Sequence, residues 1–330
     1  MVSPNRGARL IFVGGAERSG TTLVQNVLDS HPDICGAPEF HHIPDIVSLR
    51  RKLYHSIDRK HIDLICSYNE VDHLICSFIE NILYPLADKY GCQFLSEKTP
   101  NNILVFPELI DLFPKSHFIY VVRDPRAIIA SMLQVGIRGQ KAGWKMQDFT
   151  QSMSAAISYV KRCYKSGVIS YKAAPEKVLI VAYEQLVSNP EHETKRICSF
   201  LKINWSNKML CPGSIKHLGE KAVTNDVWYD TKSYSRDVEP YEVDKWKNQL
   251  TYTQKVVITT AFMGNEDLAR CGYVFSSDDL SRINRVVGFT IRACLHLSKM
   301  VVGRSVALAR RGRTKVRQRL RFLHHVANPE

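Results

Sequence analysis

The order of apolar and polar stretches along the chain predicts strands that alternate with helices. Four apolar runs rich in β-branched or aromatic residues have the length of buried parallel strands. They lie at the start of Leu10–Val24, at Gln93–Ser96, at His117–Val122 and at Lys177–Tyr183. Helical patterns follow these runs, and such an alternation favours a parallel sheet with right-handed crossover connections. We therefore predict an α/β fold with three layers, α/β/α, around a parallel central sheet.

Two stretches depart from this alternation. Residues from about 40 to 90 have helical patterns and little strand signal, so we predict a helical insertion over the ligand edge of the sheet. Residues 202–251 mix turn-forming residues with aromatic ones, which favours an ordered loop that closes over a ligand. Further helices are predicted at Pro125–Ser131, at about 146–165, at Pro190–Leu201 and at Thr253–Arg270.

The first predicted strand leads into a sequence typical of an anion-binding loop. A turn with Gly15 and Gly20 precedes Thr21 and Thr22, where a helix begins. A glycine-rich turn lets an anion approach the backbone, and the first N–H groups of the helix point at it. The glycine spacing is P-loop-like, but the lysine of a Walker A motif is absent and Arg18 supplies the positive charge. The two glycines alone fit an ordinary strand-turn-helix equally well, whereas the whole run favours a phosphate-type site.

Polar residues follow two other predicted strands at the same edge of the sheet. Lys98 follows the second strand and Arg123 the third, and ligands of open α/β sheets bind at the carboxyl ends of strands. Ser131 lies in the helix that Pro125 begins, so its hydroxyl and the Arg123 guanidinium can converge on one phosphate. Taken alone, Lys98 fits a solvated loop lysine and Arg123 a solvated arginine beside a helix cap. Next to the glycine loop, phosphate binding is favoured.

Composition adds limits on domain organisation and location. The 330 residues, 45% of them hydrophobic, suffice for one large α/β domain, which we place at residues 1–275. Nine cysteines occur without C-x-x-C spacing, so we expect reduced thiols and no metal site. The chain shows neither an N-terminal apolar segment of signal-peptide length nor about 18 uncharged apolar residues in a row. We therefore expect a cytoplasmic protein.

The net charge of +13 is concentrated at the C-terminal end. Residues 276–330 hold twelve Lys and Arg against three Asp and Glu, a net charge of +9, which leaves +4 for residues 1–275. We predict a basic helical extension there, and residues 286–323 fit an amphipathic helix on an anionic membrane surface. A solvated helix packed on the domain and a disordered tail fit the same pattern. No nucleic-acid-binding module accompanies the charge, so we expect no nucleic acid partner, and we leave a homodimer open.

Two motifs together resemble a known enzyme family. The run Arg18–Leu23, followed by Leu28–Pro32, resembles the 5′-phosphosulfate loop of sulfotransferases that use 3′-phosphoadenosine 5′-phosphosulfate (PAPS), and among them the tyrosylprotein sulfotransferase branch. The run Tyr120–Ser131 resembles the family's 3′-phosphate motif. The resemblance extends over about Ile11–Tyr273. It implies transfer of a sulfuryl group from PAPS to an acceptor without a required metal, with 3′-phosphoadenosine 5′-phosphate (PAP) as the product.

The resemblance also implies roles for individual residues. The 5′-phosphosulfate would be held by Arg18, Ser19, Gly20, Thr21, Thr22 and Leu23. Glu39, twenty-one positions after Arg18, would be the general base, while Lys98 and Arg18 would neutralise charge on the leaving group. The other nucleotide contacts that the family implies are Arg123, Ser131, Tyr183 and Arg236.

The chain departs from the family pattern around the glutamate. The family reads Glu-Glu-Thr-Arg there, whereas this chain reads Pro38–His41. Secretory members of the family tie this loop to the lysine strand with a disulfide, but this chain has Cys35 on one side and Ser96 on the other. The acceptor therefore stays open among a carbohydrate, a lipid, a small molecule with a hydroxyl or amine, and peptidyl tyrosine.

Two other functions fit parts of the pattern. A P-loop kinase or NTPase would need a Walker lysine, which is missing. A non-catalytic protein that binds a nucleotide or an anionic membrane would keep the glycine loop without Glu39 and Lys98, and both are present. We predict a PAPS-dependent sulfotransferase in which Glu39 takes the acceptor proton. His41 and His42 are the competing bases, because an imidazole titrates near neutral pH.

Overall fold

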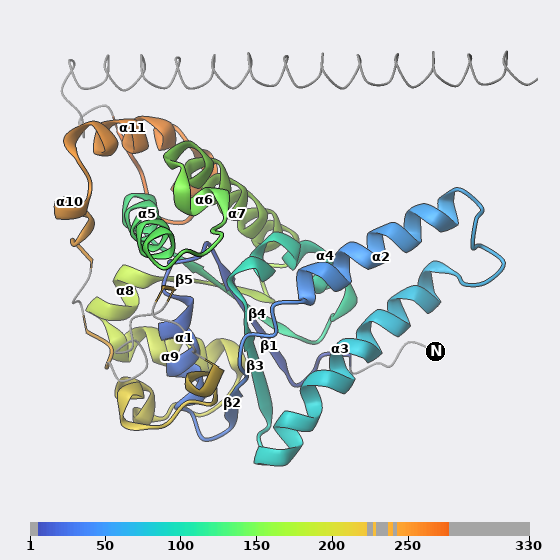
Figure 1. Cartoon of the computed structure of the whole chain (residues 1–330). Coiled ribbons are helices and arrows are strands. Elements are labelled where there is room, and N and C mark those ends of the chain that lie inside the picture. The colour runs from blue at the N-terminus through green and yellow to red at the C-terminus, as the bar shows by residue number, and fades with distance from the viewer. Residues whose placement is uncertain (1–5, 223–226, 229–236, 240–242, 277–330) are drawn as a thin grey trace, which may run out of the picture. The chain divides into compact units, whose positions relative to one another are not determined.

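A parallel five-stranded sheet forms the centre of the protein (Figure 1). The computed structural model describes residues 6–222, 227–228, 237–239 and 243–276. The strands are β1 (Leu10–Gly15), β2 (Ile34–Gly36), β3 (Phe94–Lys98), β4 (His117–Val122) and β5 (Val178–Ala182), in the order β2-β3-β1-β4-β5. The predicted α/β fold with a parallel central sheet is confirmed. The sequence pattern missed β2, because three residues are too few to show a strand period.

Twelve α-helices and four short 3₁₀ helices occur in the part of the chain that the structure describes. The α-helices are α1 (Thr21–Asp29), α2 (Ile43–Asp58), α3 (Tyr68–Tyr90), α4 (Phe106–Leu112), α5 (Pro125–Lys141), α6 (Asp148–Gln151), α7 (Met153–Ala173), α8 (Tyr183–Ser188), α9 (Pro190–Leu201), α10 (Trp246–Gln249), α11 (Tyr252–Phe262) and α12 (Glu266–Arg270). The 3₁₀ helices are η1 (Pro100–Val105), η2 (Asn207–Leu210), η3 (Pro212–Ser214) and η4 (Leu218–Ala222).

Two predicted helices are each divided in two. The helix predicted at about 146–165 is α6 followed by α7, because Ser152 leaves the helical conformation and its side chain caps α7 by accepting from the Ala155 N–H. The helix predicted at Thr253–Arg270 is α11 followed by α12. Gly264 lies between them with φ of 63°, a left-handed conformation that interrupts an α-helix.

Alternate strand residues face the two helical layers, as the pleat of a strand requires. On one face, Ile11 and Val13 of β1 belong to a buried cluster with residues of α1, α8 and α9. On the opposite face, Phe12 stacks on Phe118 with ring centroids 5.4 Å apart, and Phe106 of α4 meets Phe118 edge-on at 5.2 Å. The sheet is thus buried on both faces, and the loops of the site leave the carboxyl ends of these buried strands.

The strand register brings three of these loops to one place. Val13 of β1 pairs with Lys98 of β3, and Gly15 of β1 pairs with Val121 of β4. The loop after β1, the turn after β3 and the start of α5 after β4 therefore leave the sheet side by side. The residues singled out on these segments are brought to the same edge by the parallel topology alone.

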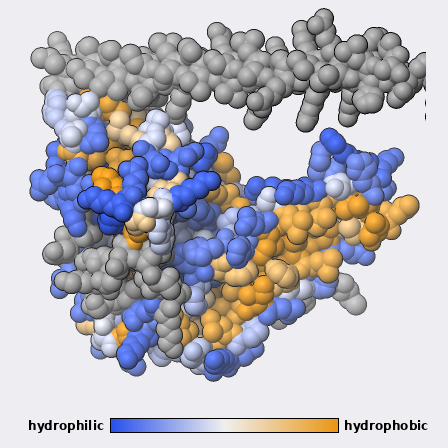
Figure 2. Space-filling model, viewed as in Figure 1, coloured by the Kyte–Doolittle hydropathy of each residue, from blue (hydrophilic) through white to orange (hydrophobic). Residues whose placement is uncertain are grey.

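The helices α2 and α3 occupy the region of the predicted helical insertion and pack against each other as they run away from the sheet (Figure 1). A capping box of Ser67 and Glu70 fixes the start of α3. Apolar surface extends along both helices (Figure 2). The large apolar side chains exposed on this hairpin include Leu49, Leu64, Ile65, Leu74, Phe78 and Ile82.

The chain divides into two compact units. One consists of Met1–Leu250 with Gly264–Val274 and contains the sheet, and the other consists of Thr251–Met263 with Phe275–Glu330. The predicted division into residues 1–275 and 276–330 stays a prediction, and the basic extension lies outside the described residues after position 276. Among the helices that the structure describes, none combines the length and the apolar character needed to cross a membrane.

Candidate active site

The loop between β1 and α1 has the shape of an anion cradle. Gly20 precedes α1 with φ of 99°, and a Cβ at this position would lie 2.4 Å from the Tyr183 ring. A Cβ on Gly15 would lie 2.4 Å from the carbonyl oxygen of Val121. Both glycines are therefore required by close approach, and Gly20 also by its backbone conformation. The N-terminus of α1, with N–H groups that lack partners within the helix, opens onto this loop.

Ser19 in this loop has the environment expected of a ligand-binding hydroxyl. Its side chain is fully buried, and its Oγ has no hydrogen-bond partner among the described residues. Buried hydroxyls normally find a partner. The residues of the loop thus fit a phosphate group, which would accept from Ser19 and from the first N–H groups of α1.

Arg18, Arg123 and Ser131 lie together on one side of the loop. The Arg18 Nε donates to the Ser131 Oγ at 3.0 Å, and its Nη1 donates to the Trp228 carbonyl at 2.7 Å. The Arg123 Nη1 donates to the Arg18 carbonyl at 3.3 Å, and the guanidinium lies over the Tyr183 ring at 4.1 Å. The structure therefore brings the predicted 3′-phosphate pair and Tyr183 to the glycine loop. The predicted role of Arg18 at the leaving group stays a prediction.

Lys98 and Glu39 form an ion pair on the other side of the loop. The Lys98 Nζ donates to the Glu39 carboxylate and also to the Thr22 Oγ1, the latter at 3.3 Å. Both side chains are largely buried, with exposed fractions of 3% for Lys98 and 13% for Glu39. Lys98 thus lies within hydrogen-bonding distance of both the predicted general base and the start of α1.

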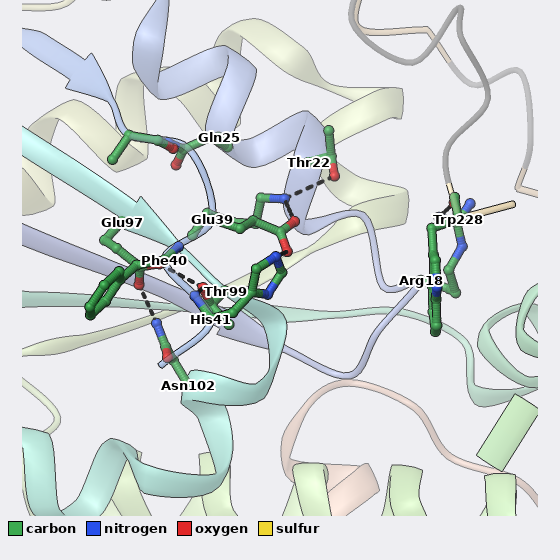
Figure 3. A network of polar contacts seen from close by, with 12 residues as sticks. Arg18, Thr22, Gln25, Glu39, Phe40, His41, Glu97, Thr99, Asn102 and Trp228 are labelled. Atoms are coloured by element: carbon green, nitrogen blue, oxygen red, sulfur yellow. Dashed lines mark hydrogen bonds and ion pairs between the residues drawn. The ribbon is translucent and has the colours of Figure 1, made fainter. Parts of the chain in front are cut away.

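The two histidines that compete with Glu39 for the role of base are both exposed. The His41 Nε2 is 3.4 Å from the Glu39 Oε2, and the imidazole is 64% exposed (Figure 3). His42 faces Asp45 at 3.4 Å and is exposed as well. His41 thus contacts the candidate base, whereas His42 is turned to a surface carboxylate.

Glu97 holds the loop that carries Glu39, and the sequence pattern gave it no role. Its buried carboxylate accepts from the Phe40 N–H at 3.2 Å, from the Thr99 hydroxyl at 2.6 Å and from the Asn102 amide (Figure 3). The Thr99 Oγ1 in turn accepts from the His41 N–H at 3.2 Å. Burial raises the pKa of Glu97, and the three donors act against that rise. An acidic residue inside a buried strand is the signal from which Glu97 could have been found.

Glu17 is a second acid that the sequence pattern left without a role. Its Oε1 accepts from the Asn101 amide at 3.0 Å, and the Asn101 Oδ1 accepts from the Tyr159 hydroxyl at 2.7 Å. Burial, with the nearby negative charge of Glu39, raises the pKa of Glu17 to about 8. The carboxyl group therefore keeps its proton at neutral pH to a large extent.

Cys35 and Cys92 form a disulfide between β2 and the segment that joins α3 to β3. Their Cα atoms are 5.9 Å apart, although 57 positions separate them in the sequence. The expectation that all nine cysteines are thiols is wrong for these two, because the fold brings them together. Reduced cysteines therefore no longer support the predicted cytoplasmic location, because disulfides persist in oxidising compartments. The location stays a prediction. Ser96, at the position of the family's second cysteine, donates instead to the Cys35 carbonyl at 3.3 Å.

Two other predictions are not tested by the described residues. Arg236 lies outside them, and so does the membrane-binding segment 286–323. In the described part of the chain, no group of three or more His, Cys, Asp or Glu residues has the arrangement of a metal site. The predicted independence from metal stays a prediction that needs an experiment.

Comparison with known proteins identifies relatives of the chain. A model of the sulfotransferase family matches residues 10–207. Protein-tyrosine sulfotransferase A of Caenorhabditis elegans is 31% identical over 257 residues, which are 73% of this chain and 62% of that protein. Protein-tyrosine sulfotransferase 1 of Danio rerio is 28% identical over 273 residues, 82% of this chain and 73% of that protein. Among solved structures, the sulfotransferase domain of the Synechococcus PCC 7002 olefin synthase is 20% identical with a TM-score of 0.49, covering 76% of this chain and 91% of that domain.

The family match covers more than half of the chain and includes both motifs on which the predicted resemblance rests. The relatives named as protein-tyrosine sulfotransferases agree with the predicted branch. The chain belongs to the sulfotransferase family.

Proposed function

We propose that this protein transfers a sulfuryl group from PAPS to the hydroxyl of a tyrosine in a polypeptide. The observation that carries the proposal is the buried pair of Lys98 and Glu39 next to Thr22 at the start of α1. A cation and a base held at an anion-binding helix terminus are the groups that transfer from a phosphosulfate requires. The names of the relatives supply the acceptor, since they are protein-tyrosine sulfotransferases.

The glycine loop would hold the 5′ end of PAPS, which when bound supplies an activated sulfuryl group. The Ser19 hydroxyl and the N–H groups at the start of α1 would donate to the 5′-phosphate. Arg123 and Ser131 would donate to the 3′-phosphate, and the Tyr183 ring, already in contact with the Arg123 guanidinium, would border the nucleotide. This division needs Arg18 to exchange its bond to Ser131 for a bond to the ligand.

Glu39 would take the acceptor proton as the acceptor oxygen forms its bond to sulfur and the bond from sulfur to the 5′-phosphate oxygen breaks. Lys98 would neutralise the negative charge that develops on this leaving oxygen, where a preorganised donor is most effective. The ion pair with Lys98 occupies the Glu39 carboxylate, so this contact must break before Glu39 can take a proton. Since the Lys98 Nζ also contacts Thr22 at the helix terminus, a turn of the ammonium toward the bound anion would release Glu39.

The test is transfer of labelled sulfate from PAPS to a tyrosine-containing peptide, with the same peptide carrying phenylalanine as the acceptor control. Glu39→Gln should lower turnover on the order of 10²–10⁴-fold, the contribution of a general base, and leave PAP affinity unchanged. Lys98→Ala should lower turnover by about 10²–10³-fold. His42→Ala is the matched control, because this histidine is exposed and faces a surface carboxylate.

Three results would contradict the proposal. Full activity of Glu39→Gln would move the role of base to His41. An effect of Lys98→Ala confined to nucleotide affinity would remove its role at the leaving group. Labelling of the phenylalanine peptide, or of carbohydrate and lipid acceptors in its place, would replace tyrosine as the acceptor while leaving sulfuryl transfer intact.

A further inference from the structure

Glu17 connects the glycine loop to two other segments of the site. Through Asn101 its carboxyl group contacts η1, which follows Lys98, and through the Tyr159 hydroxyl it reaches α7. The second carboxyl oxygen, Oε2, is buried and has no hydrogen-bond partner among the described residues. The carboxyl group directly before Arg18 is therefore held in place by one oxygen and has no hydrogen-bond partner among the described residues at the other.

The surroundings of the Glu17 carboxyl disfavour a negative charge. Two charged groups act on this carboxyl, namely Arg18 from the same loop and Glu39 from the loop after β2. Two titratable groups of α7, Tyr159 and Cys163, also lie near it. Burial raises the pKa of Cys163 to about 12 and that of Tyr159 well above its usual range, so both are neutral below pH 9. Burial and Glu39 outweigh Arg18 at Glu17, whose pKa is about 8.

We propose that Glu17 is a positioning residue that must carry a proton when the 5′ end of the nucleotide binds the glycine loop, so that nucleotide binding takes up a proton. The neutral acid keeps its bond to Asn101 and so fixes the distance between the loop and the segment after Lys98. An ionised Glu17 would repel both the bound anion and Glu39.

This inference rests on the proposed function, because it requires that a phosphorylated nucleotide occupies the loop. Binding and protonation are then reciprocal: the anion favours the protonated acid, and the protonated acid favours the anion. If only the protonated form binds, the apparent dissociation constant scales with the inverse of the protonated fraction.

The experiment measures PAP binding to the full chain by titration calorimetry between pH 7 and pH 9, in buffers of different ionisation enthalpy. PAP is suitable because the second ionisation of its phosphates, with a pKa near 6, is largely complete above pH 7. For the unmodified protein, the dissociation constant should increase about tenfold over this range, with uptake of about half a proton per PAP at pH 8. Glu17→Gln, which keeps an acceptor oxygen for Asn101, should bind with less than twofold change and no proton uptake.

The control is Glu191→Gln, since Glu191 is exposed on α9 and pairs with Lys195, and this variant should behave as the unmodified protein does. The inference is overturned if the dissociation constant of the unmodified protein for PAP does not change with pH. It is also overturned if the dissociation constant of Glu17→Gln increases with pH as much as that of the unmodified protein. Absence of PAP binding at every pH overturns the proposed function itself. If Glu17 has a purely structural role, Glu17→Gln should weaken PAP binding equally at all pH values, and this result would also overturn the inference.

Discussion

Three carboxyl groups near the carboxyl edge of the sheet have three different environments. Glu39 is paired with Lys98, Glu97 accepts from three donors, and Glu17 accepts from one amide among the described residues. A carboxylate is stabilised by each cation or donor that it gains and destabilised by burial. The same functional group is thus suited to proton transfer, to holding a loop, and to staying neutral.

The burial of Glu17 should make the stability of the protein fall as the pH rises. Its pKa is about 8 in the folded protein and 4.5 for the unperturbed side chain. Between these values the folded state holds a proton that the unfolded state has released, so the free energy of unfolding decreases from about pH 4.5 to about pH 8, by at most about 5 kcal/mol. Glu17→Gln should remove this contribution. Denaturant unfolding at pH 6 and pH 9 measures it: the stability difference between variant and unmodified protein should be larger at pH 9, and an equal difference would refute the assignment.

At the residue scale, the sequence predicted the site residues that belong to recognisable motifs. It missed those whose role depends on neighbours that are far away in the sequence. Arg123 and Ser131 could be found because a strand end and a helix turn set their separation. Glu17 could not, because Asn101 and Tyr159, which surround it, are more than 80 positions away in the sequence. Its environment follows from the packing of η1 and α7 on the loop, which no local pattern records.

At the scale of elements, the strands control where the chemistry lies. The register of β3 against β1 sets Lys98 beside Val13, and the short strand β2 delivers the loop of Glu39 to the same edge. The apolar runs were sufficient to predict four of the strands, since burial on both faces leaves a continuous hydrophobic signal. The strand β2 leaves no such signal, so the position of Glu39 relative to Lys98 could be inferred only from the family resemblance.

The contacts of Glu97 make the loop after β2 sensitive to a change in β3. Glu97→Ala leaves the Phe40 N–H and the Thr99 and Asn102 side chains without their acceptor, which should cost about 2–4 kcal/mol of stability. Because this loop carries Glu39 and not the phosphate cradle, turnover should fall by at least tenfold with little change in PAP affinity. Glu97→Gln keeps one acceptor oxygen and should recover part of both losses. Sulfate transfer and PAP titration on the two variants measure this, and a fully active Glu97→Ala would exclude the positioning role.

For the whole molecule, ligand binding should appear as stabilisation of the folded state. A nucleotide at 100 times its dissociation constant adds about 2.7 kcal/mol to the free energy of unfolding, which for a chain of this size raises Tm by several degrees. We expect this increase with PAP, a much smaller one with ADP or with ATP and magnesium, and no change when EDTA is added. Thermal unfolding with each ligand measures it. Greater stabilisation by ATP with magnesium would favour a kinase site and contradict the sulfotransferase proposal.

Because Cys35 and Cys92 form a disulfide, the covalent structure of the protein depends on the conditions under which it folds. The disulfide joins the strand that leads into the Glu39 loop to the segment between α3 and β3, while Cys66, Cys76, Cys163, Cys198, Cys211 and Cys271 are thiols. Chain synthesised in a reducing bacterial cytoplasm and chain exported to an oxidising compartment would be two covalently different molecules, two hydrogen atoms apart in mass. Since Cys211 is exposed, oxidation after purification could also pair the wrong sulfurs. Intact-mass spectrometry of each preparation therefore belongs before any measurement of turnover.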